Sequence, residues 1–70
     1  MTDWYENRHK LRYGQVFIAR DGSKVMLDSR VPGDGTQWYV ADWVNGSWGF
    51  YHDTIEPGDL YLLIKENGDD

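Results

Sequence analysis

The sequence contains no cysteine and only two prolines among its 70 residues. The absence of cysteine excludes disulfides and thiolate metal sites, two of the usual means of reinforcing a small domain. No run of 18 apolar residues is present, so no segment is predicted to span a membrane. The first six residues also lack the basic and then apolar pattern of a signal peptide. We therefore expect a cytoplasmic protein.

Aromatic residues are abundant by contrast, with four Trp, five Tyr and two Phe. A chain of this length buries only about 60% of the surface that its unfolded form exposes, so its core is small. Each buried aromatic side chain removes roughly 150–250 Å² from water, which compensates for the short chain. The composition therefore predicts one domain with an aromatic-rich core.

The net charge of −5 is distributed unevenly along the chain. Residues 1–30 contain six basic and four acidic residues, a balance of +2, whereas residues 31–70 contain one basic and eight acidic residues, a balance of −7. A binder of duplex DNA is disfavoured, because the affinity of such proteins comes mainly from Lys and Arg at phosphates. The acidic second half better suits a protein partner with a basic surface.

Turn signals recur at regular intervals. The dipeptides at 21–22 (Asp-Gly) and 45–46 (Asn-Gly) are typical of type I′ hairpins, in which both central residues have positive φ. Residues 31–36 form a longer connection rich in glycine, and residues 56–59 (Glu-Pro-Gly-Asp) predict one turn of 3₁₀ helix. Four breaks leave five short apolar segments.

These five segments are rich in β-branched and aromatic residues and are predicted to be strands. They comprise residues 15–19, 24–28, 37–43, 47–52 and 61–64. Alternation predicts that one set of side chains points into a shared core. That set is Val16, Ile18, Val25, Leu27, Trp38, Val40, Trp48, Phe50, Leu60, Leu62 and Ile64.

Residues 1–13 are predicted to form an N-terminal arm, residues 14–65 a barrel and residues 66–70 a disordered tail. The spacing of Asp3 and Glu6 resembles a capping box, which favours a short helical turn near Trp4. We expect Trp4 to pack on the barrel. Closure into a barrel is predicted because it removes exposed sheet edges, and because no amphipathic helix is present to cover an open sheet.

The second half of the sequence resembles the SH3-like superfamily over roughly residues 37–64. A Trp-containing strand at 38–41 is followed by the Asn-Gly hairpin, a Gly-aromatic strand at 49–50 and the Ile-Glu-Pro-Gly-Asp-Leu-Tyr segment at 55–61. The resemblance implies an all-β fold: a small five-stranded antiparallel SH3-like barrel with a 3₁₀ turn before the last strand. It also implies that Trp38, Pro57 and Tyr61 line a groove for proline-rich peptides.

No pattern in the sequence indicates catalysis. The adjacent His52 and Asp53 are the only acid–base pair of interest, and the three serines show no nucleophile pattern. His9 and His52 lack the spacing of metal ligands. We therefore expect neither an enzyme nor a bound metal or cofactor.

The aromatic residues of the third and fourth strands occupy both faces of a hairpin, so some of them must be exposed. Tyr39, Trp43 and Tyr51 are the candidates for the outer face; alternatively, the arm with Trp4 and Tyr5 covers them. Exposed Trp and Tyr side chains often anchor protein interfaces.

The leading hypothesis is a non-catalytic protein-interaction module, in which these aromatics act beside an acidic surface that attracts a basic partner. The acidic candidates are Asp42, Asp53, Glu56 and Asp59. One alternative is a small acidic inhibitor of phage or plasmid type that mimics nucleic acid. The other is a binder of single-stranded nucleic acid that uses residues 8–12 with Arg20, Lys24 and Arg30. An exposed barrel edge would also permit a homodimer.

Overall fold

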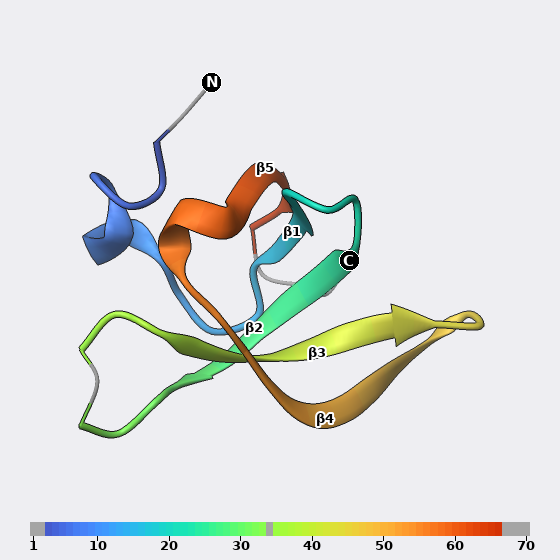
Figure 1. Cartoon of the computed structure of the whole chain (residues 1–70). Coiled ribbons are helices and arrows are strands. Elements are labelled where there is room, and N and C mark those ends of the chain that lie inside the picture. Colours follow the sequence, from blue (N-terminus) through green and yellow to red (C-terminus); the bar gives the residue numbers. More distant parts are fainter. Residues whose placement is uncertain (1–2, 34, 67–70) are drawn as a thin grey trace.

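The computed structural model describes residues 3–33 and 35–66, with only the backbone described for residues 50–52. All strands are antiparallel and form one sheet in the order β4-β3-β2-β1-β5 (Figure 1). Along the chain the elements are η1 (Arg8–Lys10), β1 (Val16–Ala19), β2 (Lys24–Arg30), β3 (Trp38–Val44), β4 (Ser47–Ile55), η2 (Pro57–Asp59) and β5 (Leu60–Lys65). The prediction of an all-β fold is confirmed. Within the described residues β4 and β5 lie at opposite ends of an open sheet.

The turn between β3 and β4 has the predicted type I′ conformation. Asn45 has φ 51° and Gly46 has φ 85°, as both central residues of this turn require. A two-residue turn fixes the register, and Trp43 accordingly lies opposite Trp48. Directly opposed residues share one face of a sheet. The predicted inward position of Trp48 is therefore wrong, because Trp48 lies on the same outer face as Trp43.

The turn between β1 and β2 differs from the prediction. Its positive φ is confined to Gly22, at 94°, and the Ala19 N–H donates to the Ser23 carbonyl at 2.7 Å. The loop therefore spans residues 20–22, one residue more than a type I′ turn at 21–22 would have. This shifts the register by one, so that Phe17 lies opposite Val25.

A shift of one residue moves a strand's side chains to the opposite face. Phe17 consequently enters the core and is 0% exposed, whereas Ile18 is half-buried opposite Lys24 on the outer face. The prediction of Ile18 as a core residue is wrong for this reason. Val16 is buried as predicted, although it lies outside the main core cluster.

Strand β5 departs from simple alternation because its pairing with β1 contains two register shifts. Each adds one β5 residue with no direct partner, and each such residue reverses the alternation that follows. As a result Leu60 is buried and Leu63 packs against the core. Leu62 and Ile64, which were predicted to be inside, are 47% and 41% exposed.

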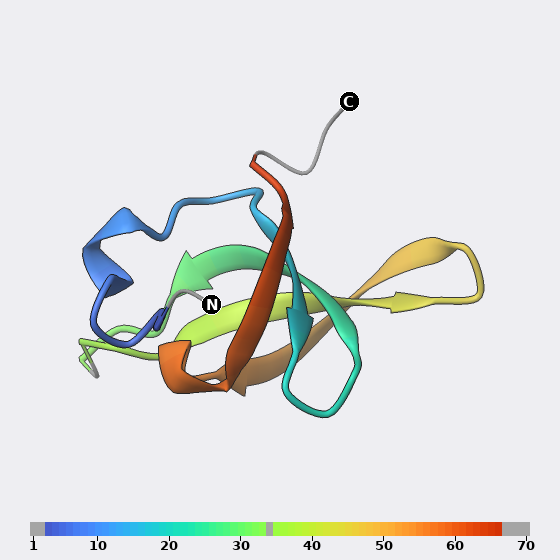
Figure 2. The same cartoon turned by 90° about the horizontal axis from the view of Figure 1, so that it is seen from above.

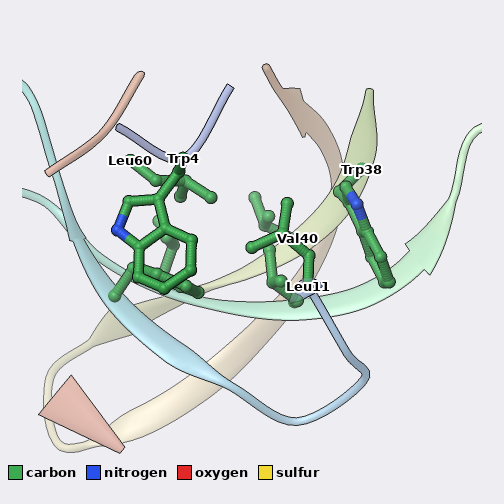
Figure 3. Close-up of a cluster of buried hydrophobic side chains, with 8 residues drawn as sticks. Trp4, Leu11, Trp38, Val40 and Leu60 are labelled. Carbon is green, nitrogen blue, oxygen red and sulfur yellow. The ribbon is translucent and has the colours of Figure 1, made fainter. Parts of the chain in front are cut away.

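The core lies in the concave side of the curved sheet and is closed by the N-terminal arm (Figure 3). Its buried members are Trp4, Leu11, Phe17, Val25, Leu27, Trp38, Val40 and Leu60. The Trp4 ring meets the Phe17 ring edge-to-face, with centroids 5.1 Å apart. The prediction that Trp4 packs on the sheet is confirmed, and the arm belongs to the same core as the strands.

Local hydrogen bonds hold the arm in place. The Asp3 carboxylate accepts the backbone N–H groups of Tyr5 and Glu6 at 3.0 and 3.4 Å, the first half of the predicted capping box. The buried Gln15 side chain accepts the Arg12 N–H at 2.8 Å, which connects the end of the arm to the start of β1. These bonds direct Trp4 toward the core.

Figures 1 and 2 show that the β3–β4 hairpin extends well beyond the other strands, and that η2 turns the chain from β4 into β5. No helix in the described part of the chain is long and apolar enough to cross a membrane. The side chain of the predicted core residue Phe50 is not described. Of the predicted tail at 66–70, residues 67–70 lie outside the described residues.

Candidate functional site

An aromatic pair lies on the outer face of the projecting hairpin. The Trp43 and Trp48 rings meet edge-to-face at a centroid distance of 5.0 Å and an interplanar angle of 72°. Trp43 is 41% exposed and Trp48 is half-buried. The type I′ turn that ends the hairpin sets these two residues opposite each other, so the pair follows directly from the Asn-Gly sequence.

A lysine on the neighbouring strand completes this surface. The Lys24 ammonium nitrogen lies 4.5 Å from the centroid of the Trp43 ring and 5.9 Å from that of Trp48. A cation over the face of an indole is attracted by the ring quadrupole. Lys24, Trp43 and Trp48 thus form a row across β2, β3 and β4, in which each member restricts the next.

The opposite face of the hairpin is acidic. Asp42 is half-buried and lines a hollow of about 200 Å³ together with Asp21 and Asp53. The pKa of Asp42 is raised by its desolvation, and further by the hydrogen bond and the negative charge of Asp53 and by the charge of Asp21. The apolar part of the lining comes from Ala19, Val25, Val40 and Ile55.

A second hollow of about 470 Å³ adjoins the first and shares four of its lining residues. It continues past Arg20 to Asp59. These two side chains form an exposed ion pair, with 4.0 Å between Arg20 Nε and Asp59 Oδ1. The Arg20 guanidinium also donates to the Gly58 carbonyl at 2.7 Å. We call the two hollows together the acidic groove; the shared residues are Ala19, Asp21, Thr54 and Ile55.

Asp21 is held at the groove by the β1–β2 turn. Its carboxylate accepts the Ser23 N–H at 2.9 Å, and the hydrogen bonds from Ser23 lower the pKa of Asp21. Asp21 is therefore ionised at neutral pH, facing a carboxyl pair on β3 and β4. The turn thus adds a third negative group to this part of the surface.

The structure brings only some of the predicted site residues together. Asp42 and Asp53 meet at the groove and Asp59 lies at its far end, whereas Glu56 is exposed outside the lining. Trp43 is at the aromatic pair, and Tyr39 is half-buried on β3. The side chain of Tyr51 lies outside the described residues.

The peptide groove implied by the SH3-like resemblance does not appear as an open surface. Trp38 is in the core cluster and Pro57 is fully buried, so neither offers a face to a ligand. Tyr61 is 46% exposed on β5. Sequence reasoning also missed Asp21 as a site residue, because its contribution depends on the way the β1–β2 turn folds toward β4.

In the described part of the chain no three His, Cys, Asp or Glu side chains are grouped so that they could hold a metal ion. His9 is exposed in η1, and the side chain of His52 is not among those described. Comparison with models of known protein families, with curated proteins and with solved structures finds no significant match to this chain.

Proposed function

We propose that this chain is a non-catalytic protein-interaction module whose anchor is the aromatic pair Trp43–Trp48. The observation that carries the proposal is the half-exposed Trp43 ring, which makes an edge-to-face contact with Trp48 and has the Lys24 ammonium over its face. Tryptophan is enriched among the residues that dominate interface energies. A ring that is already fixed loses little side-chain entropy on binding, which favours affinity.

We further propose that the fold is a small SH3-like barrel. Five antiparallel strands, a type I′ hairpin and a 3₁₀ turn directly before the last strand support this assignment. The proposed ligand surface is nevertheless the projecting hairpin, since Trp38 and Pro57 are buried. Function is thus assigned from the surface and not from the fold, because one fold serves many functions.

The test is affinity capture with immobilised protein from a lysate of the organism that encodes the chain. Wild type is compared with Trp43→Ala and with Tyr13→Ala, a control that removes a 70% exposed aromatic residue elsewhere. We expect one protein to be captured by wild type and by Tyr13→Ala but lost with Trp43→Ala, while circular dichroism shows all three folded. Equal capture by all three variants would refute the aromatic anchor.

A second candidate function is supported by the acidic groove. Its carboxylates, Asp21, Asp42, Asp53 and Asp59, follow one another along the surface, as expected of a protein that occupies a nucleic-acid site on its target. In that case the captured protein binds DNA or RNA, and added oligonucleotide displaces this chain. Recovery of nucleic acid itself in the capture would instead favour the single-stranded binder.

A further inference from the structure

The acidic groove is lined by both apolar groups and carboxylates, a combination that matches the side chains of lysine and arginine. Apolar groups from Ala19, Val25 and Ile55 form part of the wall, and the carboxylates of Asp42 and Asp53 lie beside them. Lysine and arginine have this composition, with an aliphatic stem that packs on apolar surface and a cationic head that stays with polar groups. The hollow at Asp42 is smaller than the roughly 300–1,000 Å³ of small-molecule pockets, which suits a single side chain.

The charges of the groove are unbalanced within the chain. Of the described residues that line it, Arg20 alone is basic, and its ion pair is with Asp59 at the far end. Asp42 and Asp53 instead interact with each other, and Asp21 adds a third carboxylate. Two carboxylates held this close cannot both ionise without mutual repulsion. A cation placed between them would relieve that repulsion.

We propose that the acidic groove binds a lysine or arginine side chain of a partner polypeptide, with its charged head between Asp42 and Asp53. The ligand class is therefore a basic peptide segment. This inference rests on the proposed function in one respect, namely that the ligand is a protein. It does not depend on the Trp43 anchor, because the groove lies on the opposite face of β3. The Arg20–Asp59 pair marks the far end of the groove, where the peptide would continue.

The chain offers a charge-matched control for this proposal. Asp28 and Glu66 are exposed acidic residues that do not line the groove. The variant Asp42→Asn/Asp53→Asn and the control Asp28→Asn/Glu66→Gln therefore change the net charge by the same amount. Loss of folding does not threaten the comparison, since Asn keeps the shape of Asp and removes a repulsion; thermal unfolding of both variants checks this.

The experiment measures fluorescence anisotropy of labelled hexaarginine and hexalysine at 50 and 150 mM salt, with hexaglutamate as the negative probe. We expect wild type to bind both basic peptides, the groove variant to bind at least tenfold more weakly and the control to change less than twofold. In NMR spectra of the wild type, the peptide should shift the backbone amides of Ala19, Thr54 and Ile55.

The proposal would be overturned by the absence of binding by wild type. It would also be overturned by an equal weakening in both double variants, which would indicate unspecific attraction by net charge. Amide shifts confined to regions outside the groove would also overturn it. Trp43→Ala separates this proposal from the aromatic anchor, because the variant should lose the captured partner and still bind hexaarginine. Each proposal can therefore fail without the other.

Discussion

Among the described residues, the pair Trp4–Phe17 and the pair Trp43–Trp48 share nearly the same edge-to-face geometry, and their surroundings differ. Trp4 meets Phe17 at 5.1 Å and 82°, and Trp43 meets Trp48 at 5.0 Å and 72°. Trp4 is 9% exposed over a Phe17 that is fully buried, whereas Trp43 is 41% exposed. The same interaction therefore closes the core in one region and stabilises an open surface in the other.

The difference follows from what each pair is attached to. Trp4 joins the N-terminal arm to β1 and is enclosed by core residues from several elements (Figure 3). Trp43 and Trp48 are paired within one hairpin that extends past the end of β2, so few elements can cover them (Figure 1). Ring geometry alone does not distinguish a core residue from a binding residue. The distinction comes from how many secondary-structure elements surround the pair.

The largest expected effect comes from breaking each pair in turn. Trp4→Ala should lower the free energy of unfolding by about 3–5 kcal/mol, because it removes a large core side chain and leaves a cavity. A domain of this size has only about 3.5–10 kcal/mol in total. Trp43→Ala should cost about 1 kcal/mol, since its exposed ring contributes mainly the edge-to-face contact. Urea denaturation measures both, and similar losses would contradict the distinction between the two pairs.

The turns explain how far the sequence could predict this fold. Asn45-Gly46 was correctly interpreted as a two-residue turn, and that turn by itself places Trp48 opposite Trp43. The alternation of residues along each strand placed Trp43 and Trp48 on different faces, whereas the register that the two-residue turn imposes places them on the same face. The position of Trp48 was therefore predictable, and the error lay in weighting alternation above turn geometry.

The β1–β2 turn was less accessible to prediction. Asp-Gly fits both a two-residue loop and a three-residue loop with glycine at its last position, and the choice moves Phe17 or Ile18 into the core. The bulges of β5 likewise depend on tertiary packing. Among the site residues, Asp42 and Asp53 could be predicted from their charge, whereas the contribution of Asp21 required the fold of the turn.

The second prediction concerns the acidic face of the exposed hairpin. Because the pKa of Asp42 is raised in the folded state, the folded protein binds more protons than the unfolded chain as pH rises above the ordinary value of 3.8. Stability from this group is thus present at low pH and lost as pH rises through the raised pKa. Above the raised pKa the ionised Asp42 opposes folding.

Asp42→Asn should accordingly stabilise the protein at pH 7 by about 0.5 kcal/mol, as expected for removing a like-charge pair on adjacent strands. Thermal unfolding should show an increase of roughly 2–4 °C. This increase should shrink as the pH falls through the raised pKa of Asp42 toward the ordinary value of 3.8. Asp28→Asn, a change of equal charge on β2, is the control and should have little effect. A destabilised Asp42→Asn variant would contradict this prediction, because it would show that the Asp42 carboxylate stabilises the fold as the core residues do.

The last prediction, with an effect as small as that of Asp42→Asn, concerns the cation above the exposed pair. Lys24→Met keeps the aliphatic stem and removes the charge, so the free energy of unfolding should fall by about 0.5 kcal/mol through loss of the cation–π contact. A double-mutant cycle with Trp43→Leu isolates this term, because the charge should matter only while the indole is present. Zero coupling would mean that Lys24 does not restrict the Trp43 ring. The Trp43 ring would then not be held in place by Lys24 before a partner binds. The exposed and the buried pair would in that case share only their edge-to-face geometry.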